Sequence, residues 1–251
     1  QRGGSGRPFN LEQAAQGTLL APLLGKLRSN LAREMPGSTL AASYTARAGG
    51  ANLALVIPQA RLAGGSGATL LSLSRAQMVA RSSGLPRFQG NFVTGGAGLP
   101  QIAGRMEQPG DGGLELRLRI AEYAAGDAWL AVPDLTLRQG NNGALSFAGR
   151  ALAEGPLPGG FARALELPLD GTYGADGTLA LWQGCRSLRF AALSAASLSL
   201  GREAITLCPP PGRPILRYGA GGLQLAAGTR ALALEGELAG RPLKLASGPV
   251  G

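Results

Sequence analysis

The sequence predicts a mainly β protein, with one large antiparallel sheet preceded by an amphipathic helix. Leucines recur at every second residue in short bursts along most of the 251 residues, and a period of two puts alternate side chains on opposite faces of a strand. The 41 glycines and 17 prolines interrupt the bursts, which suits many short strands. Asn142-Gly143 and Asp176-Gly177 are typical of hairpin turns. No helical pattern alternates with the strands, which argues against a parallel sheet.

Residues 9–36 are predicted to form the helix, and residues 1–8 a linker or cut site. Asn10 is a suitable N-cap. Pro22 either kinks the helix or begins a second helix in its first turn, and Pro36 ends it. An apolar stripe at helical spacing consists of Leu20, Leu24, Leu27, Leu31 and Met35. We expect this stripe to pack on the sheet rather than on a membrane surface, because the opposite face carries few basic residues.

Residues 37–251 are predicted to contain strands only, as a β-rich segment of a longer protein. After about residue 179 the strands come at regular intervals, which predicts a meander that adds strands in order. The alternation gives this segment one apolar face. Its expected members are Leu114, Leu116, Leu118, Ile120, Leu179, Leu181, Leu188, Phe190, Leu198, Leu200, Ile205, Leu207, Leu223, Leu225, Leu232 and Leu234.

The net charge of +9 leaves two interpretations open. A basic chain favours anionic partners such as lipid headgroups or nucleic acid, but scattered arginines also arise from codon bias and serve solubility. Nucleic-acid binding normally needs clustered cations with interleaved aromatic residues, and the four tyrosines are far apart. We therefore expect no nucleic-acid partner.

No constellation of catalytic residues is evident, and we interpret the chain as non-enzymatic, with no cofactor and no metal site. It has no histidine, which removes the common triads and most catalytic zinc sites. The glycine clusters complete no phosphate-binding motif. Glu235 and Glu237 share a strand face, as two glycosidase carboxylates do, but such a pair is more often a solvated strand edge.

Cys185 and Cys208 are the two cysteines of the chain and flank two predicted strands. A bridge between them would stabilise the fold by about 3 kcal/mol and would indicate an oxidising compartment such as a bacterial periplasm. The alternative is two unrelated buried thiols. No stretch approaches the roughly 18 apolar residues of a membrane helix.

One part of the sequence resembles a known family. Trp182–Phe190, Leu198–Leu200, Leu207–Pro209 and the leucine meander that follows resemble the C-terminal part of the YdbH family, AsmA-like proteins of Gram-negative bacteria. The helix around Ala21–Leu27 is also similar to such proteins, and the specific part of the resemblance covers about residues 179–250.

The resemblance implies intermembrane phospholipid transport in the periplasm. It implies a long, twisted and curved sheet, or β-groove, whose apolar face shields acyl chains, so the sixteen apolar residues above become the expected lipid contacts. It further implies an inner-membrane anchor outside this segment and a small outer-membrane lipoprotein partner that binds by strand addition. No catalytic residue is carried over.

A second function class stays open. A non-enzymatic structural or interaction module of the envelope, folded as a closed sandwich or solenoid, would show the same alternation with its leucine faces packed on each other. The two classes differ in one observable feature, which is whether the leucine face is open.

Overall fold

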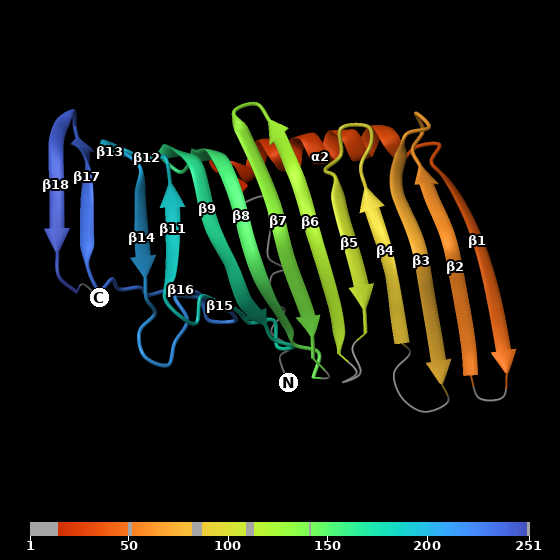
Figure 1. The fold of residues 1–251 in the computed structure, drawn as a ribbon. Helices are drawn as coiled ribbons and strands as arrows, with labels where there is room; N and C mark the ends of the chain where they lie inside the picture. The colour runs from red at the N-terminus through yellow and green to blue at the C-terminus, as the bar shows by residue number, and fades with distance from the viewer. Residues whose placement is uncertain (1–14, 50–51, 82–86, 109–112, 141, 250–251) are drawn as a thin grey trace, which may run out of the picture.

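The computed structural model describes residues 15–49, 52–81, 87–108, 113–140 and 142–249. Within them, a single sheet of 18 strands runs the length of the molecule and one helix, α2 (Leu20–Glu34), crosses one end of the strands (Figure 1). The predicted fold class is confirmed, and every regular element described after Ser38 is a strand. Asn142-Gly143 and Asp176-Gly177 both lie in hairpin turns, where Gly143 and Gly177 adopt positive φ.

The strands fall into nine mostly long ones followed by nine short ones. The first nine are β1 (Thr39–Gly49), β2 (Asn52–Ala63), β3 (Thr69–Arg81), β4 (Arg87–Thr94), β5 (Ile102–Glu107), β6 (Leu114–Ala125), β7 (Ala128–Gln139), β8 (Leu145–Leu157) and β9 (Gly160–Tyr173). The others are β10 (Leu179–Leu181), β11 (Arg186–Phe190), β12 (Ala192–Ala195), β13 (Leu198–Leu200), β14 (Glu203–Leu207), β15 (Leu216–Gly219), β16 (Gly222–Leu225), β17 (Leu232–Leu238) and β18 (Arg241–Ser247).

Strands β1 to β9 pair antiparallel in chain order. Beyond β9 the predicted meander is wrong. Three short strands, β10, β11 and β12, all pair with the free edge of β9, one after another along its length. Outside them lie β15, β14 and β13, and then β16, β17 and β18. Strands of three to five residues cover only part of a 14-residue neighbour, so several must share its edge.

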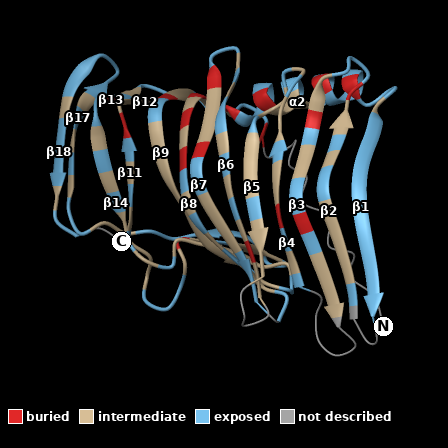
Figure 2. Cartoon of the chain, turned by 45° about the vertical axis from the view of Figure 1, so that its right-hand side comes forward, coloured by how far each residue is buried: buried red, intermediate tan, exposed pale blue. Residues whose placement is uncertain are grey.

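The sheet is a single layer. Every pair of described strands with more than marginal contact is also a hydrogen-bonded pair, so no strand packs face to face on another. Figure 2 shows the same single row, with α2 against one end and strands that bend along their length. A closed two-sheet sandwich is therefore excluded for the described residues.

Helix α2 covers the strand ends through a small apolar cluster. Leu19 and Leu23 pack on Ala128 of β7 and Ala153 of β8. Gly155 of β8 has a positive φ, and a Cβ there would lie 2.7 Å from the Cβ of Leu19, so the close approach needs glycine. Pro22 lies in the first turn of α2, one of the two expected arrangements. Residues 1–14, which include the predicted linker and the start of the predicted helix, lie outside the described residues.

A disulfide joins Cys185 to Cys208. Arg186 and Leu207 are the end pair of the β11–β14 register; Cys185 directly precedes Arg186, and Cys208 directly follows Leu207. Cys208 also exchanges two backbone hydrogen bonds with Gly228. The bridge therefore closes the open end of the β11–β14 pair, beyond which the chain leaves to form β15.

Replacing Leu23 by alanine should lower the free energy of unfolding by about 2–3 kcal/mol, because a buried leucine loses its packing and leaves a cavity. Leu23 is 5% exposed, whereas Leu20, three residues earlier on the same helix, is 40% exposed. The matched control Leu20→Ala should cost less than about 1 kcal/mol. Urea unfolding followed by fluorescence measures both values, and equal losses would contradict the packing described.

The double variant Cys185→Ser/Cys208→Ser should lose about 3 kcal/mol of stability, because the bridge closes a loop with a sequence separation of 23 in the unfolded chain. Urea unfolding with and without reductant measures this loss. Reductant should destabilise the parent chain and leave the double variant unchanged. Thiols that react with an alkylating agent before reduction would show that the bridge is absent.

Candidate lipid-contacting face

The pairing register decides which residues share a face. In antiparallel strands, directly opposite residues point to the same face and chain neighbours point to opposite faces. Leu118 of β6 lies opposite Leu135, and that row continues through Gly149 to Leu169 of β9. From β9 the register extends along three branches. The first passes through Leu181 of β10 to β15 and β16, and the second passes through β11 to β14. The third passes through Leu193 of β12 to β13, β17 and β18. Followed in this way, all sixteen residues of the predicted apolar face lie on one side of the sheet.

That apolar face is open over most of its area. Of the sixteen residues, twelve are half-buried, Leu223 and Leu225 are 65% and 69% exposed, and Phe190 and Leu200 are buried. Half-burial is the expected state of a side chain in a single layer, where lateral neighbours shield it but no facing layer does. The surface is mostly apolar, and Arg186 and Glu203 are charged members of it, opposite Leu207 and Phe190. Helix α2 covers it at one end of β6 and β7.

The same face continues through β1 to β5, which the list of sixteen does not include. Its members there include Leu40, Tyr44, Leu55, Leu73, Phe92, Ile102 and Met106. In β1 to β5, glycines interrupt the alternation of leucines in the sequence. Gly104 of β5 lies opposite Phe92, and a Cβ at Gly104 would collide with the Phe92 ring. The phenylalanine fills the space of two positions, so the sequence alternation looks interrupted where the surface is continuous.

The opposite face of the sheet is polar, and ion pairs across the strands organise it. Glu115 of β6 is 4% exposed and accepts hydrogen bonds from Arg117 Nε at 2.5 Å and from Arg138 Nε at 2.7 Å. The hydrogen bond from Arg138 is the main cause that lowers the pKa of Glu115, against the opposing effect of burial. Arg105 and Arg117 lie directly opposite each other, and both pair with Glu107, which relieves the repulsion between like charges.

Similar contacts follow the same face toward β11. Arg150 of β8 pairs with Asp134 at 3.0 Å and with Glu166 at 3.9 Å, and Arg189 of β11 also reaches Glu166. Each exposed pair contributes at most about 1 kcal/mol. Together they match charges across neighbouring strands, and they keep this face in water while the leucines occupy the other.

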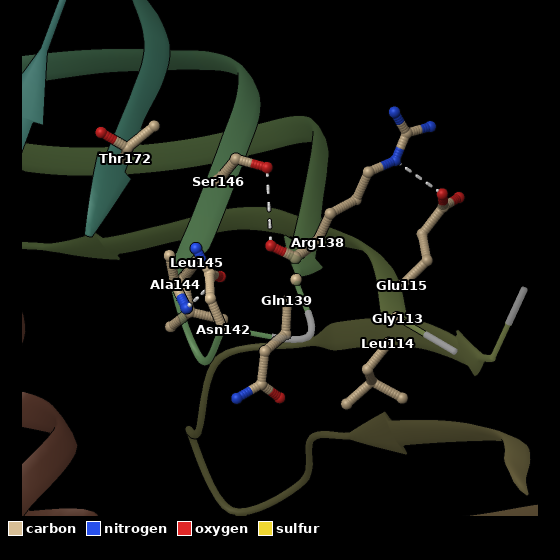
Figure 3. Close-up of a pocket in the computed structure, with 11 residues that line it drawn as sticks. Gly113, Leu114, Glu115, Arg138, Gln139, Asn142, Ala144, Leu145, Ser146 and Thr172 are labelled. Carbon is tan, nitrogen blue, oxygen red and sulfur yellow. Dashed lines mark hydrogen bonds and ion pairs between the residues drawn. The ribbon is translucent and has the colours of Figure 1, made fainter. Parts of the chain in front are cut away.

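A recess of about 640 Å³ lies at the strand ends opposite α2. Figure 3 shows Arg138 and Glu115 on one side of it, with Asn142 and Gln139 at the turn between β7 and β8. Leu114 and Leu145 of the apolar face also line it. The recess thus marks the edge where the apolar face meets the polar face, and its lining contains no nucleophile paired with a base.

No other cluster of reactive groups appears in the described part of the chain. No group of three or more cysteine, aspartate or glutamate side chains there could hold a metal ion. Glu235 pairs with Lys244 of β18 at 3.0 Å and is well exposed. Among the described residues, the extended apolar surface is therefore the candidate ligand-contacting feature.

Comparison with protein families identifies the chain. Residues 5–251 match the model of the YdbH-like family, described as intermembrane phospholipid transport protein YdbH. The chain belongs to the YdbH-like family. No curated protein and no solved structure matches the chain. The resemblance found over the C-terminal strands therefore holds for nearly the whole chain.

Membership of the YdbH-like family implies intermembrane phospholipid transport by a periplasmic protein. The family is not known to be enzymatic. None of the helices described here is both long and apolar enough to span a membrane.

Replacing Glu115 by glutamine should destabilise the YdbH-like chain at neutral pH and make no difference in strong acid. A carboxylate whose pKa is lowered on folding stabilises the folded state above its unfolded pKa of about 4.3, and this contribution is lost as the pH falls through the lowered folded pKa. Urea unfolding from pH 7 down to pH 2 measures the difference between parent and variant. The exposed Glu237→Gln variant is the control, and a difference for Glu115→Gln that persists at pH 2 would contradict the ion-pair account.

Proposed function

We propose that this chain is a segment of a periplasm-spanning lipid-transfer protein, and that its apolar face is a β-groove that shields phospholipid acyl chains between the inner and outer membranes. The observation that carries the proposal is the open apolar face, which runs from β1 to β18 on one side of a single-layer sheet. Family membership supplies the cargo class.

The dimensions and chemistry of the face suit acyl chains. Neighbouring strands lie about 4.8 Å apart. Strands β1 to β9, together with the short strands that pair outward from β9, therefore give an apolar surface roughly 50–60 Å wide. Most of the lining is leucine, alanine and other aliphatic side chains, with aromatic rings such as Tyr44, Phe92 and Phe190 among them, and these groups offer few directional contacts. Each fully buried methylene contributes about 0.8 kcal/mol. A chain can therefore shift along the face without breaking any specific bond.

The proposal includes both ends of the sheet. In the described structure β1 pairs only with β2, and β18 only with β17, so each has a free edge that can accept another strand. A small outer-membrane lipoprotein adding a strand to one edge, and an inner-membrane anchor elsewhere in the whole protein, would extend the groove to both membranes. Pro242 and Lys244 on β18 are residues that limit indiscriminate pairing at an edge.

The proposal predicts that a benzophenone amino acid at Leu118, but not at Arg119, cross-links to phospholipid. These neighbours on β6 point to opposite faces, and Leu118 is half-buried while Arg119 is exposed. The experiment uses the full-length protein in its own membrane, irradiated in cells, followed by purification and mass spectrometry of adducts.

A phospholipid adduct at Leu118 with none at Arg119 supports a lipid-bearing face. Protein adducts at Leu118 in place of lipid would instead favour a structural or interaction module, whose apolar face binds another polypeptide. Equal lipid adducts at both positions would mean that the reagent reports general contact with the membrane, and the proposal would fail.

A further inference from the structure

Helix α2 carries two stripes of residues with identical spacing, and the buried stripe that packs on the sheet is the more polar of the two. The residues that face the sheet are Leu19, Leu23, Lys26, Asn30 and Glu34. The apolar stripe is Leu20, Leu24, Leu27, Leu31 and Met35, one residue later at every step. Because each residue of an α-helix turns by about 100°, the apolar stripe points about 100° away from the contact with the sheet. The expectation that it packs on the sheet is wrong.

Polar contacts fix the rotation of α2. Lys26 Nζ donates a hydrogen bond to the Ala124 carbonyl at 2.7 Å and lies 5.0 Å from the centre of the Tyr123 ring. Asn30 Nδ2 donates to the Gly98 carbonyl at 2.8 Å.

At the C-terminal end of α2, the buried Glu34 accepts a hydrogen bond from Ser66 Oγ at 2.6 Å and one from the Ser66 backbone N–H at 3.3 Å. With the apolar contact of Leu19 and Leu23 at its start, the helix is held from β8 to the β2–β3 turn. Rotation that buried the apolar stripe would break these bonds.

The handedness of the helix gives the direction of the apolar stripe. In Figure 1, α2 runs behind the upper ends of the strands, from the β8 side toward the β3 side. Seen along that direction the sheet lies to the right, and a right-handed helix turns clockwise as it recedes. Each residue of the apolar stripe comes one position after a residue that contacts the sheet. The stripe therefore points downward in this view, across the apolar face toward the opposite strand ends.

Burial agrees with this direction. Val132 of β7 and Ala151 of β8 lie on the apolar face, one row further from the helix-covered ends than the Leu130–Ala153 pair that the cluster contacts. They are 5% and 4% exposed. The stripe itself stays largely accessible, since Leu20, Leu31 and Met35 are 40%, 36% and 51% exposed and Leu24 and Leu27 are half-buried.

We infer that α2 is a lateral wall of the lipid groove, and that phospholipid acyl chains lie in the corner between its apolar stripe and the sheet. The inference rests on the proposed function and adds where the cargo lies. The apolar stripe points toward the part of the apolar face that holds the buried Val132 and Ala151, so the sheet and the helix present apolar side chains on two sides of one corner. An acyl chain on the open sheet contacts protein on one side, whereas in the corner it contacts protein on two, and more of each methylene leaves water.

The test places a benzophenone amino acid at Leu24, Leu31 or Ser29 of the full-length protein in cells, with Leu118 as the reference site. Ser29 is exposed and lies about 100° from the sheet contact in the opposite sense, so it points away from the groove. Phospholipid adducts at Leu24 and Leu31 as strong as those at Leu118, with loss of the signal at Ser29, are the expected result.

The outcomes test the role of α2 as a wall and the lipid groove itself separately. Adducts at Leu118 without adducts at Leu24 and Leu31 would leave the groove standing and overturn the wall. Adducts at none of these sites would overturn both. Adducts at Ser29 equal to those at Leu24 would overturn the wall, because the helix would then meet lipid on all sides. As a second measurement, the Leu24→Asp/Leu31→Asp variant should lose copurifying phospholipid, and the matched Ser29→Asp variant should retain it.

Discussion

The apolar face stays continuous because each β-bulge is matched by a one-residue shift in the apolar pattern of its strand. A bulge inserts one extra residue and bends the strand, so an unbroken alternation would carry every later leucine to the wrong face. In β7 the apolar positions are Leu130 and Val132 before the irregularity and Leu135 and Leu137 after it. β6 makes the same shift between Ile120 and Tyr123. The sheet can therefore bend across many strands while its two faces keep their opposite chemistry.

The alternation was enough to predict the strands, the hairpin turns and the shared face, because all three depend on neighbours in sequence. It was not enough to predict the order of strands beyond β9. That order depends on how many short strands fit along one long edge, and β10, β11 and β12 share the edge of β9. Pairings such as β13 with β17 join segments that no local pattern relates.

Helix α2 shows a second limit of predicting structure from sequence periodicity. Its leucine stripe is the obvious candidate to pack on the sheet by periodicity, yet the contact stripe one residue earlier contains Lys26, Asn30 and Glu34. These look like a solvated face in the sequence. They contact the sheet because the end of β6 and two turns between strands present backbone carbonyls and a serine hydroxyl, and buried polar groups of that kind need partners. Only the tertiary structure places those turns beneath the helix.

An open apolar face has an energetic consequence for a lipid carrier. A sheet that packed its leucines against a second layer would gain stability but would leave no surface for cargo. Here lateral contacts between neighbouring leucines shield each side chain in part, while cross-strand ion pairs and the disulfide stabilise the layer without covering it. The remaining exposed apolar area is unfavourable in water. Acyl chains that cover it lower the free energy of cargo and protein together, so the same exposure that limits the stability of the empty sheet provides the affinity of the proposed groove.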